Sequence, residues 1–290
     1  MKSVNTSYYS KKFVCLALLV LTVSSYAQNQ TLIYNSVDDS LGKYSFGLVK
    51  LALERSDYTW DFEIVEGEIS QARVIEMVDG GKLDVMWAAT NQEMEERLEP
   101  IRIPLYKGLL GHRIFLIEAS GQPKFDAVRS LEDLRSLSMG QGTTWADTGI
   151  LRHNGLKVVT ANKYDSLFYM VEGGRFDAYP RGVQEPWSEM AARPQLPLTV
   201  EKRLMLVYKM PFYLFVSKDN SLLKNELYKG LRAMIADGTF HEYFITDPTV
   251  QDVVDKSNIK NRISFHLSNP TLPVKTPVDD ASLWLDPTQL

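Results

Sequence analysis

Two places in the sequence carry residues suited to binding an anion. Arg97 follows three nearby glutamates, and a guanidinium group matches a carboxylate through two parallel hydrogen bonds. Thr143 and Thr144 precede an expected helix start, where backbone N–H groups bind anions and a hydroxyl adds a hydrogen bond. Each has a plainer alternative, because Arg97 can pair with the glutamates on the surface and a threonine can simply cap the helix. The residues alone favour the surface role for Arg97.

Four more residues are candidates for lining a ligand pocket. Trp87 ends an expected parallel strand, so its ring can form an apolar or cation–π wall in the crevice beyond the sheet; core packing is the alternative. Tyr106 and Tyr34 are weaker candidates of the same kind. Thr90 opens a Thr-Asn-Gln-Glu capping box that satisfies free backbone N–H groups, and it allows the same choice between capping and ligand contact.

Motifs for catalysis and cofactor binding are missing from the sequence. It has no Gly-x-Gly-x-x-Gly, no phosphate-binding P-loop and no Gly-x-Ser-x-Gly elbow. The four histidines are scattered, and none is paired with another at metal-ligand spacing. We therefore expect neither a metal nor a cofactor.

Residues 1–27 have the pattern of a secretory signal peptide. Three lysines precede an apolar run at 13–23, which holds the sole cysteine, and Ser25-Tyr26-Ala27 fits a small-x-small cleavage site. The run is too short to span a membrane as a helix. Removing the three lysines takes the formal net charge from −4 to −7, which argues against nucleic acid as a partner. We expect a monomer in the periplasm.

One stretch of sequence occurs twice. The shared core stands at 77–84 and again at 170–177, and it reads Met-Val, an acid, Gly-Gly, a base, an apolar residue and Asp. Paired glycines can close a helix, and the apolar run that follows suits a parallel strand. Each copy therefore predicts a helix-to-strand joint, and together they predict two similar α/β lobes with a ligand site between them.

The hydrophobic pattern extends this organisation along the chain. We expect strands at 32–34, 60–65, 83–87, 137–140, 158–159 and 176–179. We expect helices at 44–55, 70–78, from 90, 130–134, from 145, 164–171, 225–235 and 239–244. Extended segments at 109–117 and 203–217 should cross between the lobes, and prolines with short polar runs indicate an irregular tail after residue 245.

Taken in order, these motifs resemble those of the bacterial periplasmic solute-binding proteins of the amino-acid type (family 3, type II fold). The resemblance covers residues 30–245. In the first lobe it rests on Gly-Lys-Leu-Asp at 81–84, the helix between Thr90 and Arg97, and Pro-Leu-Tyr at 104–106. In the second it rests on Ser-Leu-Glu-Asp-Leu at 130–134, Gly-Gln-Gly-Thr-Thr at 140–144 and Gly-Arg-Phe-Asp-Ala at 174–178.

The resemblance implies an α/β fold with two similar lobes joined by a two-strand hinge. With it we assign 28–112 with 207–245 to lobe 1 and 113–206 to lobe 2. Beyond the resemblance, Phe265 and Trp284 indicate that the C-terminal tail, 246–290, packs on the body. Arg97 falls where the family's arginine grips the ligand carboxylate. The family's acidic contact for an α-amino group is replaced here by Pro180 or Arg181. Arg181 facing the cleft would favour a ligand with two negative groups or no amine; Glu185 can replace the acid, or Arg181 can be a solvated loop residue.

The leading hypothesis is a periplasmic solute-binding protein that closes on a small polar, carboxylate-bearing ligand such as an amino acid or related organic anion. Its partner would be a membrane ABC permease or a sensor receptor. One alternative is a dehydratase-like periplasmic enzyme on the same fold, with Glu185 or Glu172 as its base. Another is a sensory or orphan binding protein whose tail contacts a partner.

Overall fold

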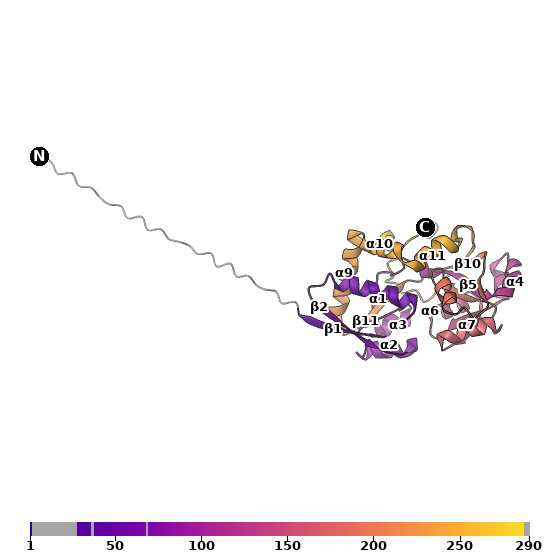
Figure 1. Cartoon of the computed structure of the whole chain (residues 1–290), viewed down its shortest axis with the longest axis horizontal. Helices are drawn as coiled ribbons and strands as arrows, with labels where there is room; N and C mark the ends of the chain where they lie inside the picture. The colour runs from indigo at the N-terminus through magenta and orange to yellow at the C-terminus, as the bar shows by residue number, and fades with distance from the viewer. Residues whose placement is uncertain (2–27, 36–37, 68, 287–290) are drawn as a thin grey trace.

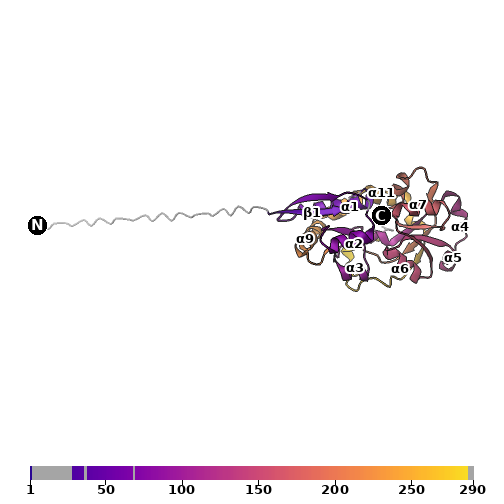
Figure 2. The same cartoon turned by 90° about the horizontal axis from the view of Figure 1, so that it is seen from below.

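The computed structural model describes Met1 and residues 28–35, 38–67 and 69–286, so residues 2–27 of the predicted signal peptide lie outside the described residues. No helix in the described part of the chain is long and apolar enough to cross a membrane. Figures 1 and 2 show two halves side by side, each combining helices with strands. The α/β class predicted from the sequence is confirmed.

The first half is built mainly from the N-terminal part of the chain and is completed by a later segment. Its elements are β1 (Asn29–Asn35), α1 (Ser40–Leu53), β2 (Thr59–Val65), α2 (Gln71–Asp79), β3 (Met86–Ala89), α3 (Gln92–Arg97), β4 (Leu98–Ile101), β11 (Phe212–Ser217), α9 (Ser221–Asp237) and α10 (Thr239–Thr246). Strands β1 and β2 pair in parallel, and β11 lies between β3 and β4 in an antiparallel sheet. Helices α1 and α9 pack closely at Gly230, where a Cβ would clash with the carbonyl oxygen of Ala52.

The second half holds the middle of the chain. Its elements are β5 (His112–Glu118), α4 (Gln122–Asp126), α5 (Leu131–Arg135), β6 (Ser138–Gly142), α6 (Ala146–His153), β7 (Lys157–Ala161), α7 (Tyr164–Glu172), β8 (Tyr179–Gly182), α8 (Pro186–Ala191), β9 (Leu198–Val200) and β10 (Leu204–Val207). Strand β5 pairs antiparallel with β8, β9 and β10, while β6 and β7 pair in parallel.

The chain passes between the halves twice, after β4 and again between β10 and β11. The two passages touch at Gly111, where a Cβ would clash with the carbonyl oxygen of Tyr208. Short 3-10 turns stand at Leu109–Gly111, Ala119–Gly121, Ile259–Asn261 and Ala281–Leu283. The residue at which each lobe begins stays a prediction.

The repeated motif forms the same joint in both halves, as predicted. Helices α2 and α7 end before Gly81 and Gly174, which have left-handed φ values of +66° and +67°. The aspartate at the end of the motif makes the same kind of hydrogen bond in both copies: Asp84 accepts the N–H of Ile33 at 2.7 Å, and Asp177 accepts the N–H of Ser138 at 2.9 Å. Each carboxylate thereby ties the joint to a neighbouring strand. The strands begin later than predicted, at residues 86 and 179, and the prediction of parallel strands is wrong: β3 pairs antiparallel with β11, and β8 pairs antiparallel with β5.

The irregular conformation expected after residue 245 is wrong for residues 248–266, whereas residues 267–286 contain no helix or strand apart from the 3-10 turn at Ala281–Leu283. The segment forms α11 (Pro248–Lys256) and β12 (Ile263–His266), and β12 pairs in parallel with β10. Pro248 lies in the first turn of α11, where a missing N–H costs nothing, so this proline starts a helix rather than breaking one. Arg262 is buried and donates to the carbonyl oxygens of Glu201 and Leu204 at 2.7 and 3.0 Å.

Candidate ligand-binding site

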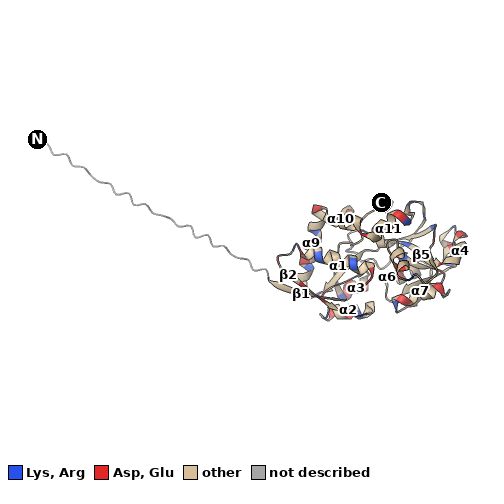
Figure 3. Ribbon diagram, in the orientation of Figure 1, with Lys and Arg blue, Asp and Glu red and all other residues tan. Residues whose placement is uncertain are grey.

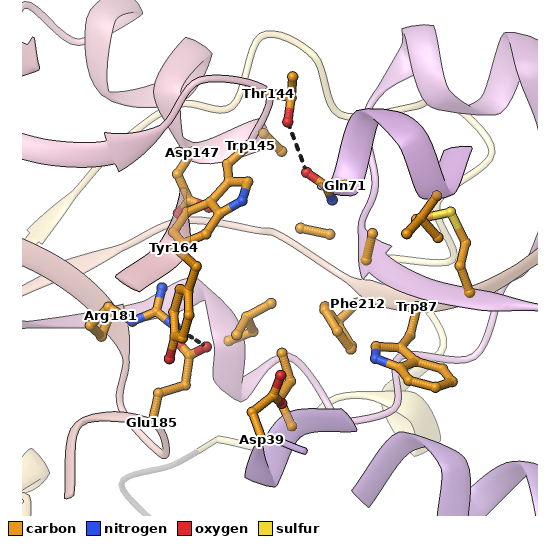
Figure 4. A pocket seen from close by; sticks show the side chains of 18 of the residues that line it. Asp39, Gln71, Trp87, Thr144, Trp145, Asp147, Tyr164, Arg181, Glu185 and Phe212 are labelled. Atoms are coloured by element: carbon orange, nitrogen blue, oxygen red, sulfur yellow. Dashed lines mark hydrogen bonds and ion pairs between the residues drawn. The ribbon is translucent and has the colours of Figure 1, made fainter. Parts of the chain in front are cut away.

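A cavity of about 720 Å³ lies between the two halves and is lined from both. The first half contributes the start of α1, the start of α2 and strand β3; the second contributes residues 142–147, Tyr164 and the segment from Arg181 to Glu189. Figure 4 shows Trp145, Tyr164 and Arg181 facing Gln71, Trp87 and Asp39, with Phe212 between them. This mixture of aromatic walls and a few polar groups is typical of a small-molecule site.

Basic and acidic side chains are mixed over both halves (Figure 3), and a concentrated group of them is buried on one wall of the cavity. Arg113 on β5 pairs with Asp147 at 2.7 Å and with Glu185 at 3.2 Å. Arg181 on β8 pairs with Glu185 at 2.7 Å and donates through Nε to both carboxylate oxygens of Glu189 at 3.0 Å. All five side chains are less than a tenth exposed. Both guanidinium groups are therefore occupied by carboxylates of the chain itself.

The faces of the Arg181 guanidinium are covered as well as its edges. Its central carbon lies 5.2 Å from the ring centre of Trp145, 5.7 Å from that of Tyr164 and 4.9 Å from that of Tyr179. The Tyr164 hydroxyl donates to Glu189, which also holds Arg181. A desolvated cation among aromatic rings is favourable. Arg181 thus fills a cation site built by its own chain.

Burial and neighbouring charges shift the proton affinities in this cluster. Burial raises the pKa of Glu185 to about 7, although Arg181 and Arg113 act in the opposite direction. Burial acts to lower the pKa of Arg181, but the Glu185 and Glu189 carboxylates outweigh it and hold that pKa well above its ordinary value. The arginine stays charged at neutral pH, so Glu185 is the group of this pair that titrates near neutrality.

Five of the predicted site residues line the cavity: Trp87, Tyr106, Thr143, Thr144 and Arg181. The Thr144 hydroxyl donates across the cavity to the side-chain oxygen of Gln71 at 3.2 Å, so one hydrogen bond joins the two halves here (Figure 4). The idea that Arg181 is a solvated loop residue is wrong. Its pairing also removes the reason to expect a ligand with two negative groups.

Three predicted residues lie outside the cavity lining. Tyr34 stacks on Phe46 with 3.9 Å between ring centres, and Thr90 is fully buried and donates to Glu95 at 2.8 Å. The predicted capping box is wrong, since Asn91 caps α3 by accepting the N–H of Met94.

Arg97 is the third residue outside the lining. Helix α3 is only six residues long, and its last residue, Arg97, pairs with Asp79 at 2.9 Å. These two side chains are 42% and 44% exposed. This placement does not fit the expected contact between Arg97 and a ligand carboxylate. It fits the alternative, an ion pair on the surface, although the partner of Arg97 is Asp79 rather than a neighbouring glutamate.

Sequence reasoning missed Arg113, Asp147 and Glu189. Arg113 gave a usable signal, because it is a lone arginine between apolar runs in the segment expected to cross between lobes. A charge in such a place must be paired, yet the partners lie 34 and 72 residues further along the chain and form no local pattern. Within the described residues, no group of three acidic, histidine or cysteine side chains is placed to hold a metal.

Comparison with known proteins identifies the fold. No family model and no curated protein matches the sequence. An ancestral arginine-binding protein solved with arginine has a TM-score of 0.56 at 18% identity, covering 75% of this chain and 98% of that one. A Salmonella typhimurium periplasmic binding protein of high arginine specificity has 0.56 at 14%, covering 75% and 97%.

The GluR0 ligand-binding core from Nostoc punctiforme, solved with L-glutamate, has a TM-score of 0.55 at 12% identity, covering 76% of this chain and 99% of that one. All three are binding proteins rather than enzymes. The chain therefore has the two-lobed fold of the type II periplasmic binding proteins, as its sequence motifs predicted.

Proposed function

We propose that the protein captures a small polar solute in the cavity between its halves, by their closure around it. The observation that carries this proposal is a cavity with walls from both halves and a hydrogen bond, from Thr144 to Gln71, between them. A solute held there would touch both halves at once, so its binding would favour the closed arrangement. The periplasm and delivery to an ABC-type membrane permease complete the proposal; a sensor receptor is the alternative destination.

The charges of the lining bear on the ligand. Among the described lining residues are five carboxylates and two guanidinium groups, and both guanidinium groups are paired. An excess of carboxylates disfavours a dicarboxylate ligand and favours one that carries an amine. Thr143 and Thr144, just before α6, are the proposed contacts for a single carboxylate. An amino acid or a similar small polar molecule suits this combination best.

An enzymatic alternative rests on Glu185. A buried carboxyl group with a pKa of about 7 lies in the range of a general base. However, its oxygens already accept from Arg113, Arg181 and the N–H of Gly182, which leaves little capacity for a substrate proton. Glu172, the other candidate base, lines a separate cavity in the second half. Recovery of a bound solute chemically changed, followed by NMR, would favour the enzyme.

A thermal-shift screen tests the proposed function. Residues 28–290 are heated with amino acids, dicarboxylates, amines and other small organic ions. A captured solute raises the melting temperature, since it binds only the folded chain. Trp87→Ala, in the cavity, should reduce the shift, whereas Arg97→Met, outside it, should not. Absence of a shift with every class would contradict solute capture.

A further inference from the structure

The C-terminal tail contacts both halves of the molecule. Helix α11 packs against α10 of the first half and α8 of the second, and it lies where the halves meet in Figures 1 and 2. Strand β12 then pairs with β10 of the second half. Beyond β12, Asp280 pairs with Arg232 on α9 of the first half at 3.5 Å. The tail therefore joins the halves by contacts that are additional to the two passages of the chain between them.

The end of the tail rests on both of those passages. The first passage joins β4 to β5, and the second joins β10 to β11. The N–H of Leu285 donates to the carbonyl oxygen of Lys107 in the first passage at 2.9 Å. The Trp284 ring covers the adjacent Gly108, since a Cβ there would lie 2.5 Å from a ring carbon. The same ring centre lies 4.5 Å from the ammonium group of Lys209 in the second passage. One side chain thus contacts both passages.

The backbone of the first passage is left-handed where the tail covers it. Lys107 and Gly108 have φ values of +50° and +84°. Glycine adopts such values readily, but a lysine with a positive φ is uncommon and persists only where surrounding contacts hold it. Among the described residues other than glycine, only Asn258 shares a positive φ with Lys107. The tail supplies contacts of this kind, because Leu285 and Trp284 meet these two residues.

The Trp284 ring is itself fixed within the tail. Its Nε1–H donates to the carbonyl oxygen of Pro277 at 2.8 Å. The side-chain amide of Asn269, also in the tail, donates to the carbonyl oxygen of Lys209 at 3.0 Å. The ring is therefore held against the two passages and is not free to follow either one.

We propose that the end of the tail, residues 281–285, braces the hinge formed by the two passages and favours the closed arrangement, in which the halves meet at the cavity. Parting the halves requires backbone rotation within the passages. Such a rotation moves Gly108 relative to Lys209, and a ring fixed in the tail cannot keep its contacts with both. The brace therefore stabilises the closed arrangement relative to an open one. This inference rests on the proposed function, which supplies the closing motion.

Single-molecule FRET measures the separation of the halves directly. The chain from residue 28 onward has no cysteine, so Asp57→Cys in the first half and Glu132→Cys in the second give two unique labelling sites. These side chains are 86% and 79% exposed, so the labels leave the core intact. The measurement is made without any solute and does not depend on which solute binds.

Trp284→Ala removes the ring from both passages at once. In the labelled chain, the ratio of open to closed molecules should rise about threefold or more, since loss of the cation–π contact alone accounts for a factor of that size. Lys209→Met is a second variant, which leaves the ring in place and removes only the cation. It should shift the ratio in the same direction by a smaller factor.

Phe265→Ala is the matched control. Phe265 is a half-buried aromatic residue of the tail, as Trp284 is, but it lies on β12, which pairs with β10 of the second half. Both alanine variants should lower the melting temperature, because each removes a partly buried ring from the core. Only Trp284→Ala should change the distances between the labels.

Three results would overturn the brace. Equal distance distributions in the wild type, Trp284→Ala and Lys209→Met would show that the contact does not hold the halves together. A shift to shorter distances would show that the tail keeps them apart. An equal shift in Phe265→Ala would trace the effect to lost stability rather than to the hinge. Solute capture is decided separately by the thermal-shift screen, so its failure would leave the FRET result standing.

Discussion

Replacing Arg181 by methionine tests whether this arginine is a paired structural cation or a receptor for a ligand anion. The guanidinium group lies between Glu185 and Glu189, and all three side chains are less than a tenth exposed. Methionine fills a similar space without charge, so the change isolates the loss of the cation. Arg97→Met is the matched control, because it breaks an ion pair whose side chains are 42% and 44% exposed.

The magnitude follows from burial. Removing one member of a buried ion pair leaves an uncompensated charge, which typically costs about 3–5 kcal/mol of unfolding free energy. Breaking an exposed pair costs about 0–1 kcal/mol. We therefore expect Arg181→Met to destabilise the chain by about 3–5 kcal/mol at pH 8 and Arg97→Met by less than about 1 kcal/mol.

The loss should also depend on pH. Burial holds the pKa of Glu185 at about 7, above its ordinary 4.5, and Arg181 is the main group that lowers it. Without Arg181 that pKa rises further, so the folded chain binds a proton that the unfolded chain releases. Stability then falls as pH rises from about 4.5 through the folded pKa, and is recovered on acidification. The variant should therefore lose less at pH 5 than at pH 8.

Urea denaturation followed by tryptophan fluorescence, at pH 5 and pH 8, measures both effects in the wild type and the two variants. A loss below about 1 kcal/mol for Arg181→Met at pH 8 would refute the buried pairing, since only exposed pairs cost so little. An equal loss at both pH values would refute the coupling to Glu185.

Three further changes give measurable outcomes. Thr144→Val removes the hydrogen bond to Gln71, which is worth about 0.5–1.5 kcal/mol. The variant should therefore release solute about two- to tenfold faster in stopped-flow measurements. An unchanged release rate would count against closure through this contact. Burial lowers the pKa of His112 to about 4, so the melting temperature of the wild type should fall as pH drops from 6.5 to 4. In His112→Asn the melting temperature should depend less on pH over this range. An equal pH dependence in both chains would exclude His112 as its source. Arg262→Met should lower the free energy of unfolding in urea by about 3 kcal/mol, because the buried carbonyl oxygens of Ser257, Glu201 and Leu204 lose their donor. A loss near zero would show that the tail contributes little to stability.

Local patterns predicted the frame of this fold well. The repeated Met-Val-acid-Gly-Gly motif marked two helix-to-strand joints, because paired glycines and apolar runs have the same local preferences in both copies. Thr143 and Thr144 were placed correctly at the cavity because they precede α6. Trp87 also lines the cavity, but it is the second residue of β3, which pairs antiparallel with β11, and not the end of a parallel strand.

Long-range pairing was the part that the sequence did not reveal. Arg113 meets Glu185 across 72 residues of chain, and no periodicity connects the two positions. Arg97 was misplaced because its position depends on the length and direction of a six-residue helix, which decide whether a side chain points into a cleft or toward Asp79. Pro248 was misread because a proline ends one helix and begins another with equal ease.

The most direct test is a calorimetric titration of residues 28–290 with the solute that gives the largest thermal shift, run beside Trp87→Ala. Our account predicts one solute molecule per chain and an affinity reduced about tenfold or more in the variant, because Trp87 lines the cavity. No saturable binding, or equal affinity in both chains, would contradict the claim that the cavity between the two halves captures a solute.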